Sequence, residues 1–125
     1  GYKTWELPAF YASESGLDVE YEIGWALEIA EILKTKWSLS IDGGVLVTNP
    51  IPVAFELESS IMNEAINEAI IEANNENISG KEITPYLLSK VNELTEGKSL
   101  DANIKLIQNN ANLASKIALH YSNQG

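Results

Sequence analysis

Residues 43–52 (GGVLVTNPIP) constrain the fold of this chain more than any other stretch. Residues 45–48 predict a short, fully buried strand of an α/β protein, because their apolar run follows two glycines. Asn49 comes at the carboxyl end of this strand, and two prolines then stiffen the exit from the sheet. Ligands of open α/β sheets bind beyond the carboxyl ends of the strands, so Asn49 is a candidate substrate-binding residue. The alternative is a turn asparagine that bonds its own backbone.

The chain has 125 residues, enough for one domain with a hydrophobic core. It does not begin with Met, and Gly1 leads at once into residues 6–11 (ELPAFY). This start is typical of a strand end that enters a loop whose earlier half is missing. No repeat or low-complexity tract interrupts the sequence. We therefore expect residues 1–125 to be one part of a single domain of a longer protein.

The acidic balance excludes two classes of partner. There are 18 acidic and 8 basic residues, a formal net charge of −10, which repels both nucleic acid polymers and anionic membrane surfaces. No segment approaches the roughly 20 apolar residues that span a bilayer, and no secretory leader is recognisable. Cysteine is absent, which excludes disulfides and thiolate nucleophiles. These features favour a cytoplasmic protein.

The chain contains a single histidine, His120. A Ser-His-Asp triad or a site with several histidine ligands is therefore hard to build from this chain alone. Any metal would have to be a hard ion held by oxygen atoms, such as magnesium or manganese.

The spacing of apolar residues predicts four helices. We place them at residues 26–37, 61–73, 84–94 and 99–121. Thr84 and Pro85 predict the start of the third, because the hydroxyl can cap free amides and proline suits the first turn. The first helix is expected to pack on the sheet. The resulting fold class is α/β, with helices packed on a mixed sheet in an α/β/α sandwich.

The second helix carries an acidic face. Its members repeat at roughly helical spacing and are Glu58, Glu64, Glu68 and Glu72. We interpret them as a solvated face rather than as metal ligands.

Two asparagines interrupt the apolar arc of the last helix. Asn103 and Asn110 lie two turns, about 10 Å, apart in the middle of that arc. Burying an unpaired amide costs on the order of 1–3 kcal/mol, so each should have a partner. That partner is either a neighbouring element or a ligand in a polar pocket against the helix. The adjacent Asn109 is expected to point to water.

Four stretches carry a resemblance to a known enzyme family. They are residues 6–16 (ELPAFYASESG), 43–52 (GGVLVTNPIP), 80–88 (GKEITPYLL) and 94–118 (LTEGKSLDANIKLIQNNANLASKIA). Through them the chain resembles the carboxyl-terminal part of the pseudouridine-5′-phosphate glycosidases, also called the indigoidine synthase A-like family. Trp5 and Leu7 depart from the commoner Asp and Phe of the family's first loop.

The resemblance implies a reversible cleavage of the C–C glycosidic bond of pseudouridine 5′-phosphate, which gives uracil and ribose 5-phosphate. In the family a lysine forms a Schiff base with C1 of the opened ribose, a carboxylic residue donates a proton, and an aspartate helps to hold a divalent metal, typically manganese. These three residues belong to the family's amino-terminal part. The present segment alone is therefore expected to be inactive, and the complete enzyme to be a homotrimer.

The resemblance also assigns roles to residues of this chain. Asn110 matches an asparagine associated with the family's active site and is the predicted catalytic residue. Asn49 and Thr84 lie in matching motifs, and with Asn103 they are predicted to bind the substrate. No metal ligand is expected within the chain.

Two other functions stay open at this point. The chain could be a non-catalytic module that binds a sugar phosphate or a nucleotide at Asn49, Asn110 and helix amino termini. It could also be a structural segment that pairs with an amino-terminal chain.

Overall fold

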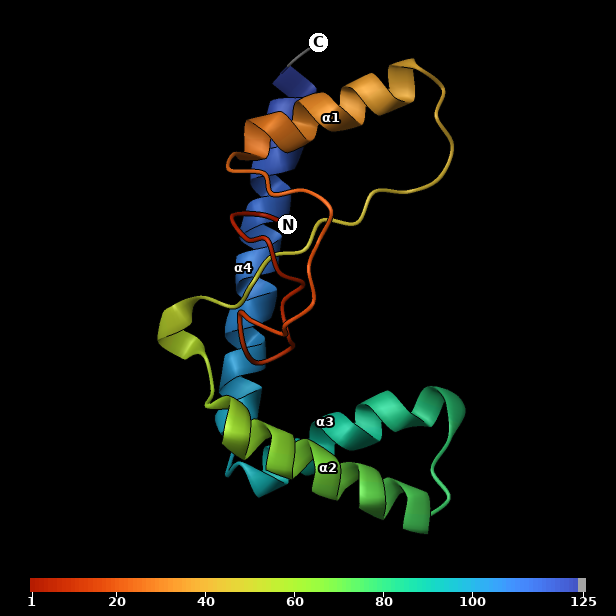
Figure 1. The fold of residues 1–125 in the computed structure, drawn as a ribbon, viewed down its shortest axis with the longest axis vertical. Coiled ribbons are helices and arrows are strands. Elements are labelled where there is room, and N and C mark those ends of the chain that lie inside the picture. The colour runs from red at the N-terminus through yellow and green to blue at the C-terminus, as the bar shows by residue number, and fades with distance from the viewer. Residues whose placement is uncertain (124–125) are drawn as a thin grey trace.

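The computed structural model describes residues 1–123 and is mostly helical (Figure 1). The elements in order are α1 (Ala26–Ser38), the 3-10 helix η1 (Val53–Phe55), α2 (Ser59–Asn75), the 3-10 helix η2 (Gly80–Glu82), α3 (Ile83–Leu94) and α4 (Lys98–Asn123). The four predicted α-helices are confirmed. None of the helices in the described part is both long enough and apolar enough to cross a bilayer.

The long helix α4 runs through most of the molecule (Figure 1). α1 lies across its carboxyl-terminal end, and α2 and α3 pack side by side near its amino-terminal end. The loops of residues 1–25 and the extended chain that follows α1 lie between these two helical ends. Because α4 contacts both ends, it determines how the loops are placed relative to the helices.

α1 packs against α4, which corrects the prediction that it packs on a sheet. Its buried residues are Ala26, Ile29 and Ala30, which recur at the three- and four-residue steps of one helix face. The apolar period was therefore interpreted correctly, but another helix, rather than a sheet, covers the apolar face.

The predicted strand over residues 45–48 is not formed in the described chain. These residues are extended but irregular, and Leu46, expected to be buried, is 83% exposed. A strand exists only where a neighbour accepts and donates its backbone hydrogen bonds. No backbone hydrogen bond joins residues 43–47 to another segment of residues 1–123.

Three extended segments nevertheless meet beside Thr48. The Tyr2 N–H donates to the Thr48 carbonyl at 2.8 Å, and the Ile23 N–H donates to the Gly1 carbonyl at 2.9 Å. Tyr2 and Ile23 form an isolated parallel bridge. Within the described residues there are only such single bridges and no strand, so the α/β/α sandwich stays a prediction for the complete protein.

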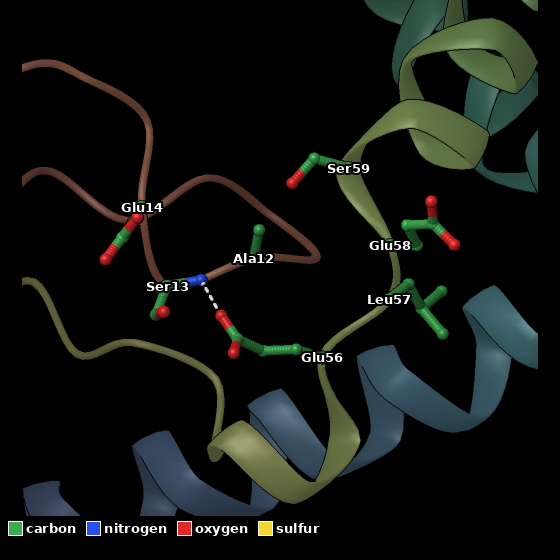
Figure 2. Close-up of a pocket in the computed structure, with 7 residues that line it drawn as sticks. All are labelled: Ala12, Ser13, Glu14, Glu56, Leu57, Glu58 and Ser59. Atoms are coloured by element: carbon green, nitrogen blue, oxygen red, sulfur yellow. Dashed lines mark hydrogen bonds between the residues drawn. The ribbon is translucent and has the colours of Figure 1, made fainter.

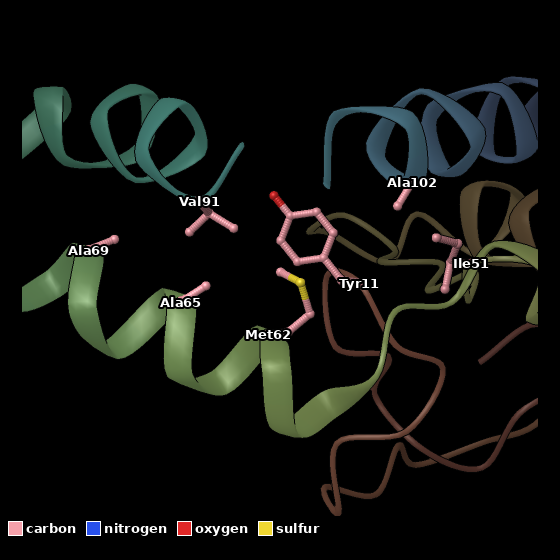
Figure 3. Close-up of a cluster of buried hydrophobic side chains, with 7 residues drawn as sticks. All are labelled: Tyr11, Ile51, Met62, Ala65, Ala69, Val91 and Ala102. Atoms are coloured by element: carbon pink, nitrogen blue, oxygen red, sulfur yellow. The ribbon is translucent and has the colours of Figure 1, made fainter. Parts of the chain in front are cut away.

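The main core lies where α2, α3 and the amino-terminal end of α4 meet (Figure 3). Three of its seven buried members are alanines, which lets the helices approach closely. Its buried members are Tyr11, Ile51, Met62, Ala65, Ala69, Val91 and Ala102. Tyr11 and Ile51 come from loops, so the core also holds the two loop segments that resemble the family's motifs.

The acidic face of α2 is mostly solvated, as predicted. Glu58, Glu64 and Glu68 are exposed. Glu72 is half-buried and forms an ion pair with Lys90 of α3 at 2.8 Å, which links the two helices.

Candidate functional site

The structure brings two predicted site residues together. Asn49 Nδ2 donates to Asn110 Oδ1 at 3.0 Å, which joins the extended segment after α1 to the middle of α4. Asn49 is half-buried and Asn110 is exposed. Among the described residues no other hydrogen bond uses Asn110 Nδ2 or Asn49 Oδ1. The amide pair therefore still offers a donor and an acceptor to a ligand.

Asn109 does not point to water, which corrects the prediction for that residue. Its Nδ2 donates to the Pro50 carbonyl at 3.0 Å, and the side chain is half-buried. The extended segment passes close enough to α4 for two successive asparagines to contact it. A helical wheel alone could not reveal this contact, because the partner is about sixty residues away in sequence.

Three features hold the amide pair in place. Asn109 bonds the backbone of Pro50, the next residue Ile51 is 1% exposed in the core, and prolines restrict φ on both sides of Ile51. A side chain that is positioned by its backbone and by packing loses little freedom when a ligand binds. The stiff exit predicted from the sequence is thus present, although no strand precedes it.

The other two predicted substrate-binding residues lie elsewhere. Asn103 is half-buried on α4, about two turns before Asn110. Thr84 is exposed in the first turn of α3, which starts at the end of the α2 and α3 pair away from α4 (Figure 1). Thr84 also does not cap the helix, because Glu82 is the N-cap residue. The structure therefore groups Asn49, Asn110 and, at a distance along the same helix, Asn103.

A cavity that the sequence did not indicate lies between the first loop and the segment before α2. It measures about 430 Å³ and is lined by Ala12, Ser13, Glu14, Glu56, Leu57, Glu58 and Ser59. Figure 2 shows the Glu56 carboxylate directed at the backbone nitrogen of Ser13, whose N–H donates to it. Three carboxylates make this cavity unfavourable for a phosphate group. The Ser13–Glu56 hydrogen bond instead connects the first loop to the chain that enters α2.

Glu6 organises the same loop from its other side. Its Oε2 accepts hydrogen bonds from the backbone N–H groups of Ser15 and Gly16, both at 3.0 Å. Gly16 has φ +75°, a left-handed conformation that suits glycine. Glu6 and Gly16, at the two ends of the family-like stretch 6–16, therefore both serve to shape this loop.

Tyr11 holds this loop against the core (Figure 3). Burial raises the pKa of its hydroxyl above the ordinary value, and the nearby Ser99 hydroxyl partly offsets the effect. The residues packed around it are apolar side chains of α2, α3 and α4. We therefore assign Tyr11 to positioning of the loop rather than to chemistry.

The described residues do not provide a site for the expected metal. Residues 1–123 contain no group of three or more histidine, aspartate or glutamate side chains placed to hold an ion. The acidic cavity of Figure 2 does not have that arrangement either.

Comparison with known proteins identifies the family. Residues 1–120 match the family model described as indigoidine synthase A like protein. The chain is 51% identical over 123 residues to a pseudouridine-5′-phosphate glycosidase of Brachyspira hyodysenteriae, covering 98% of this chain and 40% of that protein. It is 50% identical over 119 residues to a pseudouridine-5′-phosphate glycosidase of Caldanaerobacter subterraneus, and this match covers 95% of this chain and 39% of that protein.

Solved structures agree with this relationship. The crystal structure of the prealnumycin C-glycosynthase AlnA in complex with ribulose 5-phosphate has a TM-score of 0.82 and 26% identity, covering 97% of this chain and 40% of that one. The crystal structure of an indigoidine synthase A-like protein from Thermotoga maritima has a TM-score of 0.81 and 31% identity. This match covers 94% of this chain and 38% of that one.

The chain spans about 40% of the length of the curated relatives that it matches. The range matched by the family model contains both residues of the amide pair, Asn49 and Asn110. The chain belongs to the indigoidine synthase A-like family.

Proposed function

We propose that this chain is the carboxyl-terminal part of an enzyme that reversibly cleaves the C–C glycosidic bond of pseudouridine 5′-phosphate to uracil and ribose 5-phosphate. Relatives about 50% identical to the chain carry the name of that enzyme. A structural neighbour contains ribulose 5-phosphate, which is a sugar phosphate of the same size as ribose 5-phosphate. The observation that carries the proposal is the amide pair of Asn49 and Asn110, held on two stretches that resemble family motifs.

In this proposal Asn110 is the catalytic residue of the segment. Its Nδ2 donates to an oxygen of the sugar, and preorganised amide donors of this kind stabilise charge that develops in a transition state. Asn49 orients Asn110 and accepts from a sugar hydroxyl through its own Oδ1. Asn103 binds a more distant polar group. Thr84 lies away from the pair, so its predicted role in substrate binding remains a separate prediction.

The remaining chemistry belongs to the part of the enzyme outside this chain. There we place the lysine that forms the Schiff base, the carboxylic proton donor and the ligands of a manganese ion. The complete enzyme is proposed to be a cytoplasmic homotrimer, and the segment alone is proposed to be inactive. The net charge of −10 disfavours a nucleic acid polymer as a partner.

The test measures release of uracil from pseudouridine 5′-phosphate in the presence of manganese. It compares the complete reading frame with the 125-residue chain alone. Activity in the complete protein and none in the chain alone is expected. Absence of activity in both, with retained binding of ribose 5-phosphate, would instead support a non-catalytic sugar-phosphate module.

Asn110→Ala in the complete enzyme tests the assigned residue. We expect kcat to fall by about 10² to 10³, the usual effect of removing one amide donor to a developing charge. Asn112→Ala is the matched control, because Asn112 is an exposed asparagine two residues further along the same helix. An unchanged kcat and KM for Asn110→Ala would remove Asn110 from the site.

A further inference from the structure

The segment that carries Asn49 is held in place by few hydrogen bonds. Prolines at positions 50 and 52 remove two backbone donors, and within the described chain residues 49–51 take part in no backbone–backbone hydrogen bond. Two side-chain hydrogen bonds take their place, and both reach α4. Asn110 accepts from the Asn49 amide at 3.0 Å, and Asn109 donates to the Pro50 carbonyl at 3.0 Å. The position of the segment over α4 therefore depends on two successive asparagines.

The two asparagines reach the segment from different directions. Successive residues of an α-helix point about 100° apart around the helix axis. Both side chains contact the same short segment because the chain passes between them at Asn49 and Pro50. Two contacts from different directions restrict a shift of the segment over the helix more than either contact does alone.

The asparagines differ in what they leave free for a ligand. The Pro50 carbonyl can only accept, so Asn109 has to turn its Nδ2 toward the backbone, and its side chain is half-buried. Asn110 is exposed and uses its Oδ1 for Asn49, while its Nδ2 makes no other hydrogen bond among the described residues. Asn110 can therefore contact a substrate, whereas Asn109 is directed at the neighbouring chain.

We infer that Asn109 is a positioning residue of the enzyme. Its hydrogen bond to the Pro50 carbonyl places Asn49, and Asn49 in turn holds the Asn110 amide with its Nδ2 directed at the substrate. Asn109 itself does not touch the substrate. The inference rests on the proposed function, because it requires that Asn110 acts on the substrate.

Loss of the Asn109 donor would leave the Pro50 carbonyl without its partner and would let Asn49 move. A displacement of about 1 Å at an active site can lower the rate by about 10². Asn110 is proposed to stabilise charge that develops in the transition state, so its misplacement lowers kcat more than it raises KM.

Asn109→Asp in the complete enzyme tests the role of the donor. The carboxylate has nearly the size and shape of the amide, so packing is retained, but it cannot donate to a carbonyl. We expect kcat for uracil release to fall about 10- to 100-fold, with KM changed by less than about threefold. Asn112→Asp, which adds the same charge at an exposed position of α4, should behave like the wild type. An unchanged kcat in Asn109→Asp would overturn the inference.

A double-mutant cycle shows whether Asn109 acts through Asn110. The kcat values of Asn109→Ala, Asn110→Ala and the double variant are compared, at a temperature well below the lowest unfolding midpoint of the three. If Asn109 acts only by placing the Asn110 amide, the double variant has the kcat of Asn110→Ala alone. A residue that merely supports the fold would lower kcat by the same factor in both backgrounds, and that result would refute the positioning role.

The same measurements separate this inference from the proposed function. A lowered kcat in Asn110→Ala together with a normal kcat in Asn109→Asp would overturn the positioning role and leave the proposed function intact. Absence of uracil release from the wild-type protein would overturn both.

Discussion

At the scale of single residues, this chain uses amides and left-handed residues to fix its loops and helix ends. Asn109 and Asn110 bond the segment after α1, and a non-glycine residue with positive φ follows two residues after the end of each of α1, α2 and α3. These are Ser40, Asn77 and Glu96. At each end, backbone hydrogen bonds return to the last turn, as in a Schellman motif.

Glu96 is the least suited of these three residues to its backbone. Its φ is 53°, and the left-handed region costs a residue with a Cβ roughly 1–2 kcal/mol. Glu96→Gly is therefore expected to raise the free energy of unfolding of the complete protein by about 1 kcal/mol, measured by denaturant titration. Ser89→Gly, at an exposed position inside α3, should lower it by about 0.5–1 kcal/mol. A loss of stability in Glu96→Gly would contradict the assignment of strain to this residue.

Tyr11 should contribute a pH dependence to stability. Because burial raises the pKa of its hydroxyl, the folded state holds this proton more tightly than the unfolded state. The resulting stabilisation is complete below the unfolded pKa of about 10 and is lost as the pH rises through the higher folded pKa. Tyr11→Phe should therefore remove part of the alkaline loss of stability.

The measurement is the difference in free energy of unfolding between wild type and Tyr11→Phe at pH values from about 9 to about 11. The difference is expected to change with pH in favour of the variant. Tyr21→Phe, at an exposed position, serves as the matched control and should follow the wild type. Parallel curves for wild type and Tyr11→Phe would refute the effect.

At the scale of elements, helices in this chain approach one another through alanines. Ala65, Ala69 and Ala73 are buried on one face of α2, where α2 packs against α3. Across the same interface, Lys90 of α3 forms its ion pair with Glu72. The small residues set the distance between the helices, and the ion pair at the edge adds little because it is partly exposed.

Ala69 is the most sensitive position in this interface, since none of its surface is exposed. Ala69→Leu should cost about 1–3 kcal/mol through overpacking, measured as a shift of the denaturation midpoint of the complete protein. Asn67→Leu, at an exposed position of α2, should change stability by less than about 0.5 kcal/mol. Equal costs for the two variants would mean that α2 and α3 are not closely packed at Ala69.

At the scale of the whole molecule, the chain leaves much apolar surface uncovered. The exposed set includes three tryptophans and two isoleucines of α4, Trp5, Trp25, Trp37, Ile104 and Ile107. Contiguous apolar patches on a protein mark interaction surfaces. This observation agrees with a chain that spans about 40% of its relatives.

The double variant Ile104→Glu and Ile107→Glu tests whether these exposed isoleucines of α4 become covered in the complete protein. In the 125-residue chain alone it should lower the binding of a hydrophobic dye, because it removes exposed apolar surface. In the complete protein it should lower the midpoint of thermal unfolding, because charges are then buried without partners. A matched pair of substitutions at exposed polar positions of α4, Gln108→Glu and Ser115→Glu, should have little effect in either setting.

The sequence by itself determined the helices and the family. Helical hydrogen bonds join residues four apart, so the apolar period and the turn signals suffice to predict α1 to α4 within a few residues. The motifs at residues 6–16, 43–52, 80–88 and 94–118 likewise sufficed for the family, which the comparisons confirmed. The pairing of Asn110 with a neighbouring element was anticipated as one of two alternatives, because an amide in an apolar arc needs a partner.

Only the tertiary structure decided the rest. Residues 45–48 read as a strand, but strand hydrogen bonds come from another segment, and the described chain supplies only the single contact at Thr48. Asn109 was predicted to face solvent, but its side chain donates a hydrogen bond to the Pro50 carbonyl. The apolar arc of α4 was visible in the sequence, but which part of it is buried and which part is exposed depends on where α1, α3 and the loops pack. The apolar period of a helix depends only on the segment itself. The pairing of a strand, the hydrogen-bond partner of a polar side chain and the burial of an apolar face depend on the segments that lie next to it.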